Sequence, residues 1–260
     1  MESLKYPVIL VHGIAVHDRS KIIDFWGRIP ETFREKGNQV YYGNTDAWGG
    51  CDSNAKILKE TIEKVLLETG KEKVNIIAHS KGGIDSRWLI RKYGFEDRIA
   101  SLTTVSTPHR GSELADLIYK QKVIHYKIFR KTLDIFGKLY GDTNPDLYNV
   151  NFQLTSGKMK EFNENVKMSG KVYFQSLYTT MRNSFDDLMF YYTHSYIKKV
   201  TGENDGMVSE QSARWGDNTA KIEDGISHAE IIDYKKKNIS GKNIPGIYMK
   251  IINELRMQGF

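Results

Sequence analysis

One stretch of the chain, VNIIAHSKGGIDSRWLI at residues 74–90, constrains the fold more than any other part of the sequence. Residues 74–78 predict a short strand buried on both faces, and a helix is expected directly afterwards, from about Gly82 to Tyr93. A strand that stops abruptly and feeds a helix has to turn sharply. The residue at the apex, Ser80, is therefore expected in a strained conformation, with its side chain projecting above the sheet.

Small residues flank this serine, as such a turn requires, because the strand and helix backbones nearly touch there. Ala78 and Gly82 hold the two positions, so the segment reads A-H-S-K-G where the known turn of this type reads G-x-S-x-G. At the apex the Ser80 hydroxyl and the Lys81 amide face the same space, next to the positive end of the helix. The pattern predicts Ser80 as a nucleophile and Lys81 as an oxyanion donor through its backbone amide. The plainer interpretation is that Ser80 only caps the helix.

The rest of the chain predicts an α/β fold with a mostly parallel central sheet flanked by helices. The first 110 residues alternate short apolar strands with helical stretches, which is typical of a parallel sheet covered on both faces. Strands are expected at residues 6–11, 39–42, 74–78, 99–105, 171–178 and 219–224. Helices are expected at 22–36, where Pro30 could introduce a kink, from Asp52 or Ser53 to Gly70, at 82–93, at 117–140, at 185–200 and at 247–256. We predict one domain over residues 1–260, with a helical cap insertion at about 112–200.

A serine hydroxyl needs a base to take its proton, and histidine held by a carboxylate is the usual one. In this architecture the order along the chain is serine, acid, histidine. Of the seven histidines, only His125, His194 and His228 lie well downstream of Ser80. His125 and His194 fall in helix-like stretches, whereas His228 falls in a loop after a strand, so His228 is favoured as the base.

The acid is expected between Ser80 and His228, at the end of a strand or in the loop after it. Asp205 in the turn Asn-Asp-Gly follows the insertion and precedes the last strand, which favours it. Glu203, Asp217 and Asp224 are rivals, and an ordinary turn role for Asp205 is the alternative. In the loop after the first strand, Gly13 permits close backbone approach, so the amide of Ile14 is expected as the second oxyanion donor. His12 is expected only to orient this loop.

Several segments together resemble the bacterial triacylglycerol lipases of the α/β-hydrolase superfamily. They are YPVILVHG, VNIIAHSKGGIDSR, VSTPHRGSELAD, ENDGMVSEQSARWG and GISHAEIID, which occur in the family's order and span nearly the whole chain. The resemblance implies hydrolysis of carboxylic esters through Ser80, Asp205 and His228, with the amides of Ile14 and Lys81 as oxyanion donors. It also implies that the insertion after His109 acts as a lid.

The sequence departs from the family at one metal site. Many relatives bind a structural calcium through an acidic residue two positions after the catalytic histidine and a glutamine further on. Glu230 holds the first place here, but Tyr234 stands where the glutamine is expected. The ligands of the zinc-binding relatives are not evident either. The chemistry requires no cofactor, and the metal content is left open.

Composition excludes several other classes of protein. With 40% hydrophobic and 27% charged residues, the chain has the balance of a soluble globular protein. No segment has the roughly 18–20 apolar residues of a membrane span. The net charge of +6 comes from scattered lysines without a nucleic-acid motif, so no nucleic-acid partner is expected. The single cysteine, Cys51, cannot form an internal disulfide and is expected to be buried. No signal peptide is evident, which indicates the cytoplasm unless a leader was removed.

These observations predict a carboxylic ester hydrolase, most simply a lipase acting on medium- or long-chain acyl esters. The insertion is rich in aromatic and aliphatic residues, so an acyl chain is expected beneath it, and its basic stretch at 120–131 is expected to favour anionic lipid surfaces. Three alternatives use the same machinery, namely a short-chain esterase, a thioesterase and an acyltransferase. A further alternative is a binding protein on an inactive hydrolase scaffold.

Overall fold

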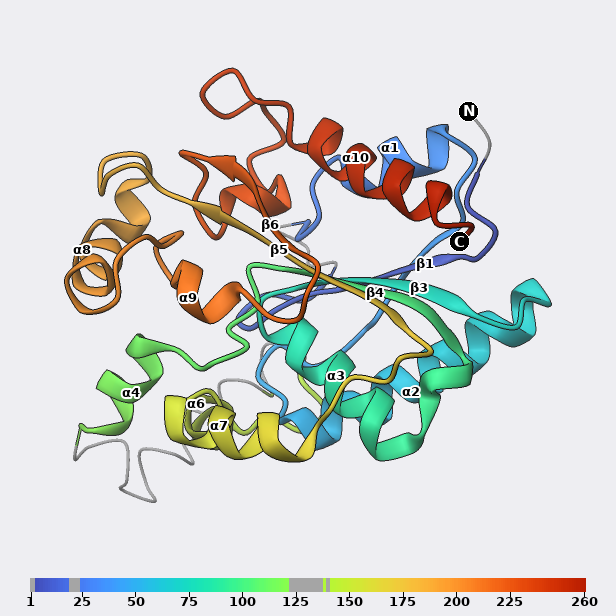
Figure 1. The fold of residues 1–260 in the computed structure, drawn as a ribbon, viewed down its shortest axis with the longest axis horizontal. Coiled ribbons are helices and arrows are strands. Elements are labelled where there is room, and N and C mark those ends of the chain that lie inside the picture. Colours follow the sequence, from blue (N-terminus) through green and yellow to red (C-terminus); the bar gives the residue numbers. More distant parts are fainter. Residues whose placement is uncertain (1–2, 19–23, 122–137, 139–140) are drawn as a thin grey trace.

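The protein forms a parallel β-sheet between two layers of helices (Figure 1). The computed structural model describes residues 3–18, 24–121, 138 and 141–260. Within these residues the sheet has six strands in the order β2-β1-β3-β4-β5-β6, and every neighbouring pair is parallel. The strands are β1 (Val8–Val11), β2 (Val40–Tyr42), β3 (Val74–His79), β4 (Ile99–Val105), β5 (Tyr173–Thr180) and β6 (Thr219–Asp224). The predicted α/β fold is confirmed.

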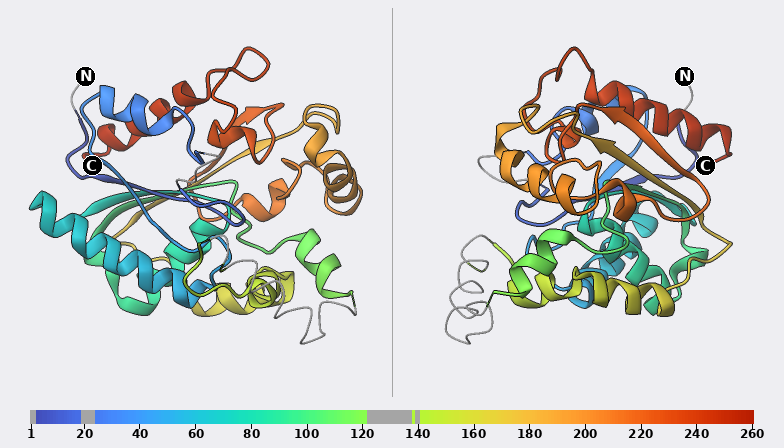
Figure 2. Two further views of the ribbon diagram at one scale, coloured as in Figure 1. Left: turned by 180° about the vertical axis from the view of Figure 1, so that it is seen from behind. Right: turned by 60° about the vertical axis from the view of Figure 1, so that its left-hand side comes forward.

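Helices cover both faces of this sheet, as Figures 1 and 2 show. Helices α1 (Ile29–Glu35) and α10 (Ile244–Met257) lie on one face, and α2 (Cys51–Thr69) and α3 (Lys81–Tyr93) lie on the other. Alternate side chains of β1 pack against the two helix layers. Val8 and Leu10 join the core beneath α1 and α10, whereas Ile9 and Val11 join the core beneath α2 and α3. Because both faces are buried, these strands carry continuous apolar runs.

Three helix boundaries differ from those expected. Helix α1 begins at Ile29 with Pro30 in its first turn, so the proline starts the helix instead of kinking it, because a first-turn N–H has no helical partner to lose. Helix α2 begins at Cys51 with Gly50 as its N-cap, two residues before Asp52, the first of the expected caps. Helix α10 begins at Ile244, again with a proline in its first turn. Gly70 ends α2 in the left-handed region, as predicted.

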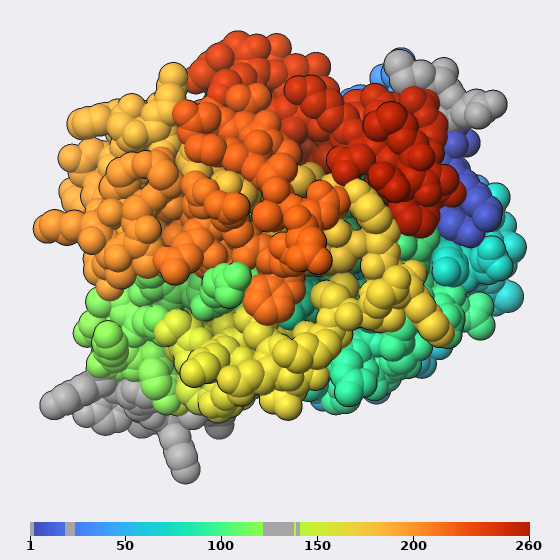
Figure 3. All heavy atoms as spheres, viewed as in Figure 1, coloured from blue at the N-terminus to red at the C-terminus, as the bar shows by residue number. Residues whose placement is uncertain are grey.

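Further helices gather beyond the carboxyl ends of the strands (Figure 1). They are α4 (Glu113–Tyr119), α6 (Leu147–Gln153), α7 (Ser156–Asn165), η3 (Leu188–Phe190), α8 (Tyr191–Val200) and α9 (Glu210–Ala213). The range 112–200 also contains β5, a strand of the main sheet, so its helices fall into two groups before and after that strand. The orange segment of α8 lies above the green segment of α4 in Figure 3, and the two helices contact each other. Most of the helical stretch expected at 117–140 lies outside the described residues.

Candidate active site

Ser80 occupies the apex between β3 and α3, in the strained conformation expected from the sequence. Its φ is 54° and its ψ is −131°, a backbone conformation that non-glycine residues rarely adopt. The turn is held by two bonds, from Ser80 N to Val105 O at 2.9 Å and from Thr107 Oγ1 to Ser80 O at 2.7 Å. A Cβ at Gly82 would lie 2.4 Å from the carbonyl oxygen of His12, so only glycine fits this close approach.

His228 and Asp205 lie beside this serine, although 148 residues of sequence separate Ser80 from His228. The Nε2 atom of His228 lies 3.0 Å from Ser80 Oγ, and its Nδ1 lies 2.8 Å from Asp205 Oδ2. The Asp205 side chain is 1% exposed, and its other oxygen accepts bonds from the amides of Met207 and Val208. A backbone bond from His228 N to Asp205 O, 2.8 Å, joins the two loops. This is the geometry of a nucleophile, a base and an orienting acid.

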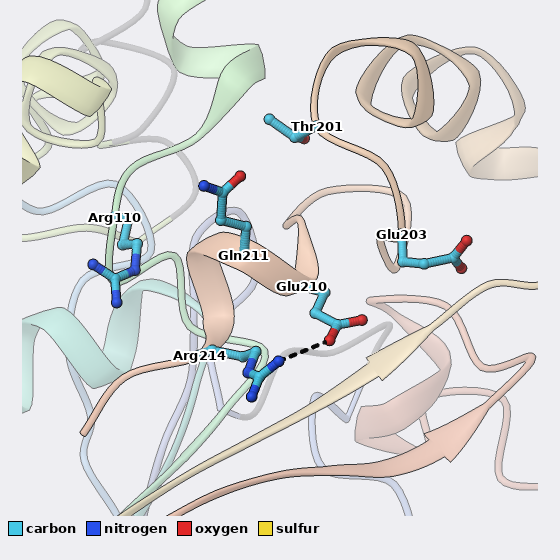
Figure 4. A pocket seen from close by; sticks show the side chains of 6 residues that line it. All are labelled: Arg110, Thr201, Glu203, Glu210, Gln211 and Arg214. Carbon is cyan, nitrogen blue, oxygen red and sulfur yellow. Dashed lines mark hydrogen bonds and ion pairs between the residues drawn. The ribbon is translucent and has the colours of Figure 1, made fainter. Parts of the chain in front are cut away.

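The rival acids have other partners. Asp224 accepts a bond from Thr180 Oγ1, and Asp217 is exposed. Glu203 pairs with Lys198 and lines a separate polar hollow of about 480 Å³, which Figure 4 shows with its ion pair between Arg214 and Glu210.

The rival histidines are placed as follows. His194 is buried in α8, where its ring contacts Ser184. His125 lies outside the described residues. Among the described candidates, the hydrogen bonds therefore join only Asp205 and His228 to Ser80.

The loop after β1 approaches the serine closely. A Cβ at Gly13 would lie 2.8 Å from Ser80 Cβ, and Ile14 lines the same cavity as Ser80 and His228. The ring nitrogens of buried His12 lie 2.6 Å from Gly13 O and 2.8 Å from Thr45 O, which ties the loop to the segment after β2, as expected for an orienting residue. Lys81 is the first residue of α3. The donor roles of the Ile14 and Lys81 amides remain a prediction.

The sequence interpretation missed the side chain of Lys81, which is buried instead of solvated. Its Nζ lies 2.6 and 2.8 Å from the two oxygens of Asp85, and Asp85 also accepts from Asn54 of α2. Burial lowers the pKa of Lys81, but the charge and hydrogen bond of Asp85, together with the charges of Cys51 and Asp142, outweigh it and the pKa is raised. The spacing i, i+4 was the available signal for this pair. Cys51, buried as predicted, is close to this ion pair.

His79 was also overlooked as part of the site. Its Nε2 donates to the carbonyl oxygen of His228 at 3.0 Å, and the two ring centroids lie 4.5 Å apart. A carbonyl only accepts, so Nε2 carries the proton. Nδ1 is buried and has no partner among the described residues. Burial, with His228 and His12 nearby, lowers the pKa of His79 well below its ordinary value, so the ring stays neutral.

An apolar cavity of about 400 Å³ opens onto Ser80 and His228. Its walls come from the loop after β1, the segment before α1, the helices α4 and α6, the segment around η3 and the turn before α9. They include Ile14, Phe25, Ile118, Leu154, Phe190 and Val208. Met189, which also lines the cavity, is 64% exposed, and Ile118 is 44% exposed. The cavity therefore reaches the surface past apolar side chains.

The calcium site of the family does not fit the residues present. The carboxylate of Glu230 accepts from the ammonium of Lys235 at 2.8 Å and from the amide of Ser227 at 3.2 Å, so both of its oxygens already have partners, one of them a cation. Tyr234 offers an aromatic ring beneath that ammonium, not an amide oxygen. The described residues contain no group of three or more His, Cys, Asp or Glu side chains that would hold a metal ion.

The site has a serine at a strand–helix turn, a histidine beside it and a buried aspartate, all on a parallel sheet covered by helices. This combination is typical of the serine hydrolases. The model of the alpha/beta hydrolase fold family matches residues 6–199, and the chain belongs to this family. Within the described part of the chain, no helix is long and apolar enough to cross a bilayer.

Named relatives are lipases, which confirms the resemblance seen in the sequence. The chain is 32% identical over 180 residues to a triacylglycerol lipase of Pseudarthrobacter phenanthrenivorans, covering 64% of this chain and 55% of that one. It is 28% identical over 263 residues to triacylglycerol lipase 2 of Saccharomyces cerevisiae, and the match covers 92% of this chain and 75% of the yeast protein. The Staphylococcus hyicus lipase structure superposes with a TM-score of 0.73 at 17% identity, covering 99% and 97%. The chain spans about half the length of the bacterial relatives it matches.

Proposed function

We propose that the protein hydrolyses carboxylic esters through Ser80, His228 and Asp205. One observation carries the proposal, namely that His228 bridges the Ser80 hydroxyl and the Asp205 carboxylate at 3.0 and 2.8 Å. His228 takes the hydroxyl proton as Ser80 Oγ attacks the ester carbonyl carbon, and then gives that proton to the departing alcohol. Water, deprotonated by His228, cleaves the acyl-enzyme and releases the acid. Asp205 holds the ring in the required tautomer.

The developing oxyanion would be bound by the backbone amides of Ile14 and Lys81. Support comes from the close approach of Gly13 to Ser80 and from the position of Lys81 at the N-terminus of α3, where the helix dipole favours negative charge. The Lys81 side chain is turned to Asp85, so the donor we assign is the amide and not the ammonium.

The substrate would be an ester with a medium or long acyl chain. The apolar lining of the cavity matches such a chain, and the exposed side chains at its mouth match contact with a lipid surface. In this proposal the helical segments of 112–200 act as the lid. Most of the basic stretch at 120–131 lies outside the described residues, and its preference for anionic lipid is tested by comparing rates on anionic and neutral vesicles.

Short-chain ester hydrolysis, thioester hydrolysis and acyl transfer would use the same three side chains. The cavity favours a longer chain over a short one, because a short chain would leave apolar wall exposed to water. A binding protein on an inactive scaffold is disfavoured by the intact hydrogen-bonded series from Ser80 to Asp205.

The test is a series of p-nitrophenyl esters of increasing acyl length, assayed with the parent and with Ser80→Ala. We expect kcat/KM to rise with chain length and activity to disappear in the variant. A maximum at the shortest esters would make the protein an esterase. Equal rates for the parent and Ser80→Ala would contradict the proposed mechanism.

A further inference from the structure

Two buried carboxylates lie next to the loop that carries His228. Glu230 is 3% exposed and follows His228 by two residues, whereas Asp187 is 7% exposed and comes from the segment after β5. Two carboxylates this deep in a protein repel each other and lose their hydration, so a compensating group is required.

The compensating group is the ammonium of Lys235. Its Nζ lies 2.8 Å from Glu230 Oε1 and 3.9 Å from Asp187 Oδ2, and its side chain is 29% exposed. Burial lowers the pKa of Lys235, but the hydrogen bond and charge of Glu230, together with the charge of Asp187, outweigh it and the pKa is raised. The lysine is therefore charged throughout the neutral range.

Both carboxylates also hold Ser227, the residue before His228. The Ser227 amide donates to Glu230 Oε2 at 3.2 Å, and its hydroxyl donates to Asp187 Oδ2 at 2.7 Å. Asp187 further accepts from the amide of Met189, a residue of the cavity wall. Lys235 thus joins two segments, one bearing the base and the other bearing part of the cavity.

We propose that Lys235 is a built-in cation, a positioning residue that fastens the His228 loop to the Asp187 segment in the place where a metal ion would otherwise serve. The inference that Lys235 holds the two segments together rests only on the contacts above. The inference that it affects turnover rests on the proposed function. Without the ammonium, two buried carboxylates and their neighbouring oxygens would face each other. Such an oxygen-rich pair attracts a divalent ion such as Ca²⁺.

The experiment replaces Lys235 by methionine and measures the melting temperature with EDTA and with millimolar CaCl₂. We expect the parent to melt at the same temperature in both. Lys235→Met should melt lower in EDTA and recover in calcium. Its kcat should fall about tenfold with little change in KM, and calcium should restore it. Lys236→Met is the matched control, because the neighbouring lysine is exposed and pairs with Asp24, and calcium should not affect it.

Two further variants keep the test decisive if Lys235→Met folds poorly. Lys235→Arg retains the charge and should behave like the parent. Lys235→Met combined with Glu230→Gln removes the repulsion and should be insensitive to calcium. The proposal is overturned if calcium stabilises the parent, if it fails to stabilise Lys235→Met, or if Lys235→Arg loses as much as Lys235→Met. The melting curves need no substrate, so a parent that hydrolyses no ester would refute the function without touching this result.

Discussion

The Ser80 turn and the His228 loop are built in opposite ways. The shape of the turn follows from neighbours in sequence, namely a buried strand, a strained apex and the glycine two residues later, and two bonds to Val105 and Thr107 then hold it in place. The His228 loop is fixed by partners from elsewhere, since His79 bonds to its backbone and Lys235 links it to Asp187. A turn set by neighbouring residues can be recognised in a short sequence motif. A loop held by distant residues cannot, because its polar contacts form only when the chain folds.

The largest effect is expected on the long-range side, at Asp205. Asp205→Asn keeps an acceptor for the amides of Met207 and Val208 but no longer fixes the tautomer of His228. We expect kcat to fall by about 10²–10⁴-fold with little loss of stability. Steady-state ester hydrolysis measures this. Asp224→Asn, at the rival acid, should change kcat by less than about twofold, and an equal loss in both variants would point to a general structural effect.

On the local side, Gly82→Ala should damage the turn itself. The added Cβ would lie 2.4 Å from His12 O and 2.7 Å from Val11 O, both backbone atoms that cannot step aside. We expect a loss of about 1–3 kcal/mol in the free energy of unfolding, measured by urea denaturation, together with lower activity. Gly157→Ala is the control, because an added Cβ meets nothing within 4 Å there, and it should be neutral or slightly stabilising. Equal stability of Gly82→Ala and Gly157→Ala would show that the turn has room for a Cβ at position 82, against the prediction.

Stability should also depend on pH through buried histidines. His79 and His109 both have pKa values lowered well below the ordinary 6.5, chiefly by burial. The unfolded chain therefore binds protons near pH 6.5 that the native protein excludes, so stability falls as pH drops below that value. Each histidine should cost about 2 kcal/mol at pH 5. Urea unfolding at pH 7 and pH 5 checks this, and His79→Phe should remove about 2 kcal/mol of the difference. An unchanged pH dependence in that variant would mean that His79 takes up its proton in the native state.

The smallest effect is expected from the bond between His79 and the His228 backbone. His79→Phe keeps a ring but removes the donor, and we expect kcat to fall about tenfold while KM changes little. His79→Gln can still donate to the His228 carbonyl and should recover most of the activity. Asn38→Ala removes two buried bonds at the distant end of the sheet, from Asn38 Nδ2 to Phe33 O and from Leu4 N to Asn38 Oδ1, and should leave kcat unchanged. If kcat fell equally in His79→Gln and His79→Phe, the hydrogen bond to the His228 carbonyl would not be the cause of the loss.

The same contrast explains what the sequence could reveal. The strands, the main helices and the Ser80 turn follow from apolar patterns and small residues, which act over a few positions. Chain order and loop context predicted His228 and Asp205, and the structure brings both to Ser80. Helix starts at prolines were misjudged, because Pro30 suits a first turn as well as a kink. The burial of Lys81 and the position of Lys235 were missed, because a lysine in a sequence looks solvated until its carboxylate partners are known.

The central claim is that Ser80 becomes acylated with His228 as its base. It is tested most directly by reacting the protein with a fluorophosphonate, digesting it and locating the adduct by mass spectrometry. We predict one adduct on the peptide containing Ser80, formed by the parent, slowed strongly in His228→Ala and absent in Ser80→Ala. An adduct on another residue, or labelling of Ser80 that is equally fast without His228, would contradict the account.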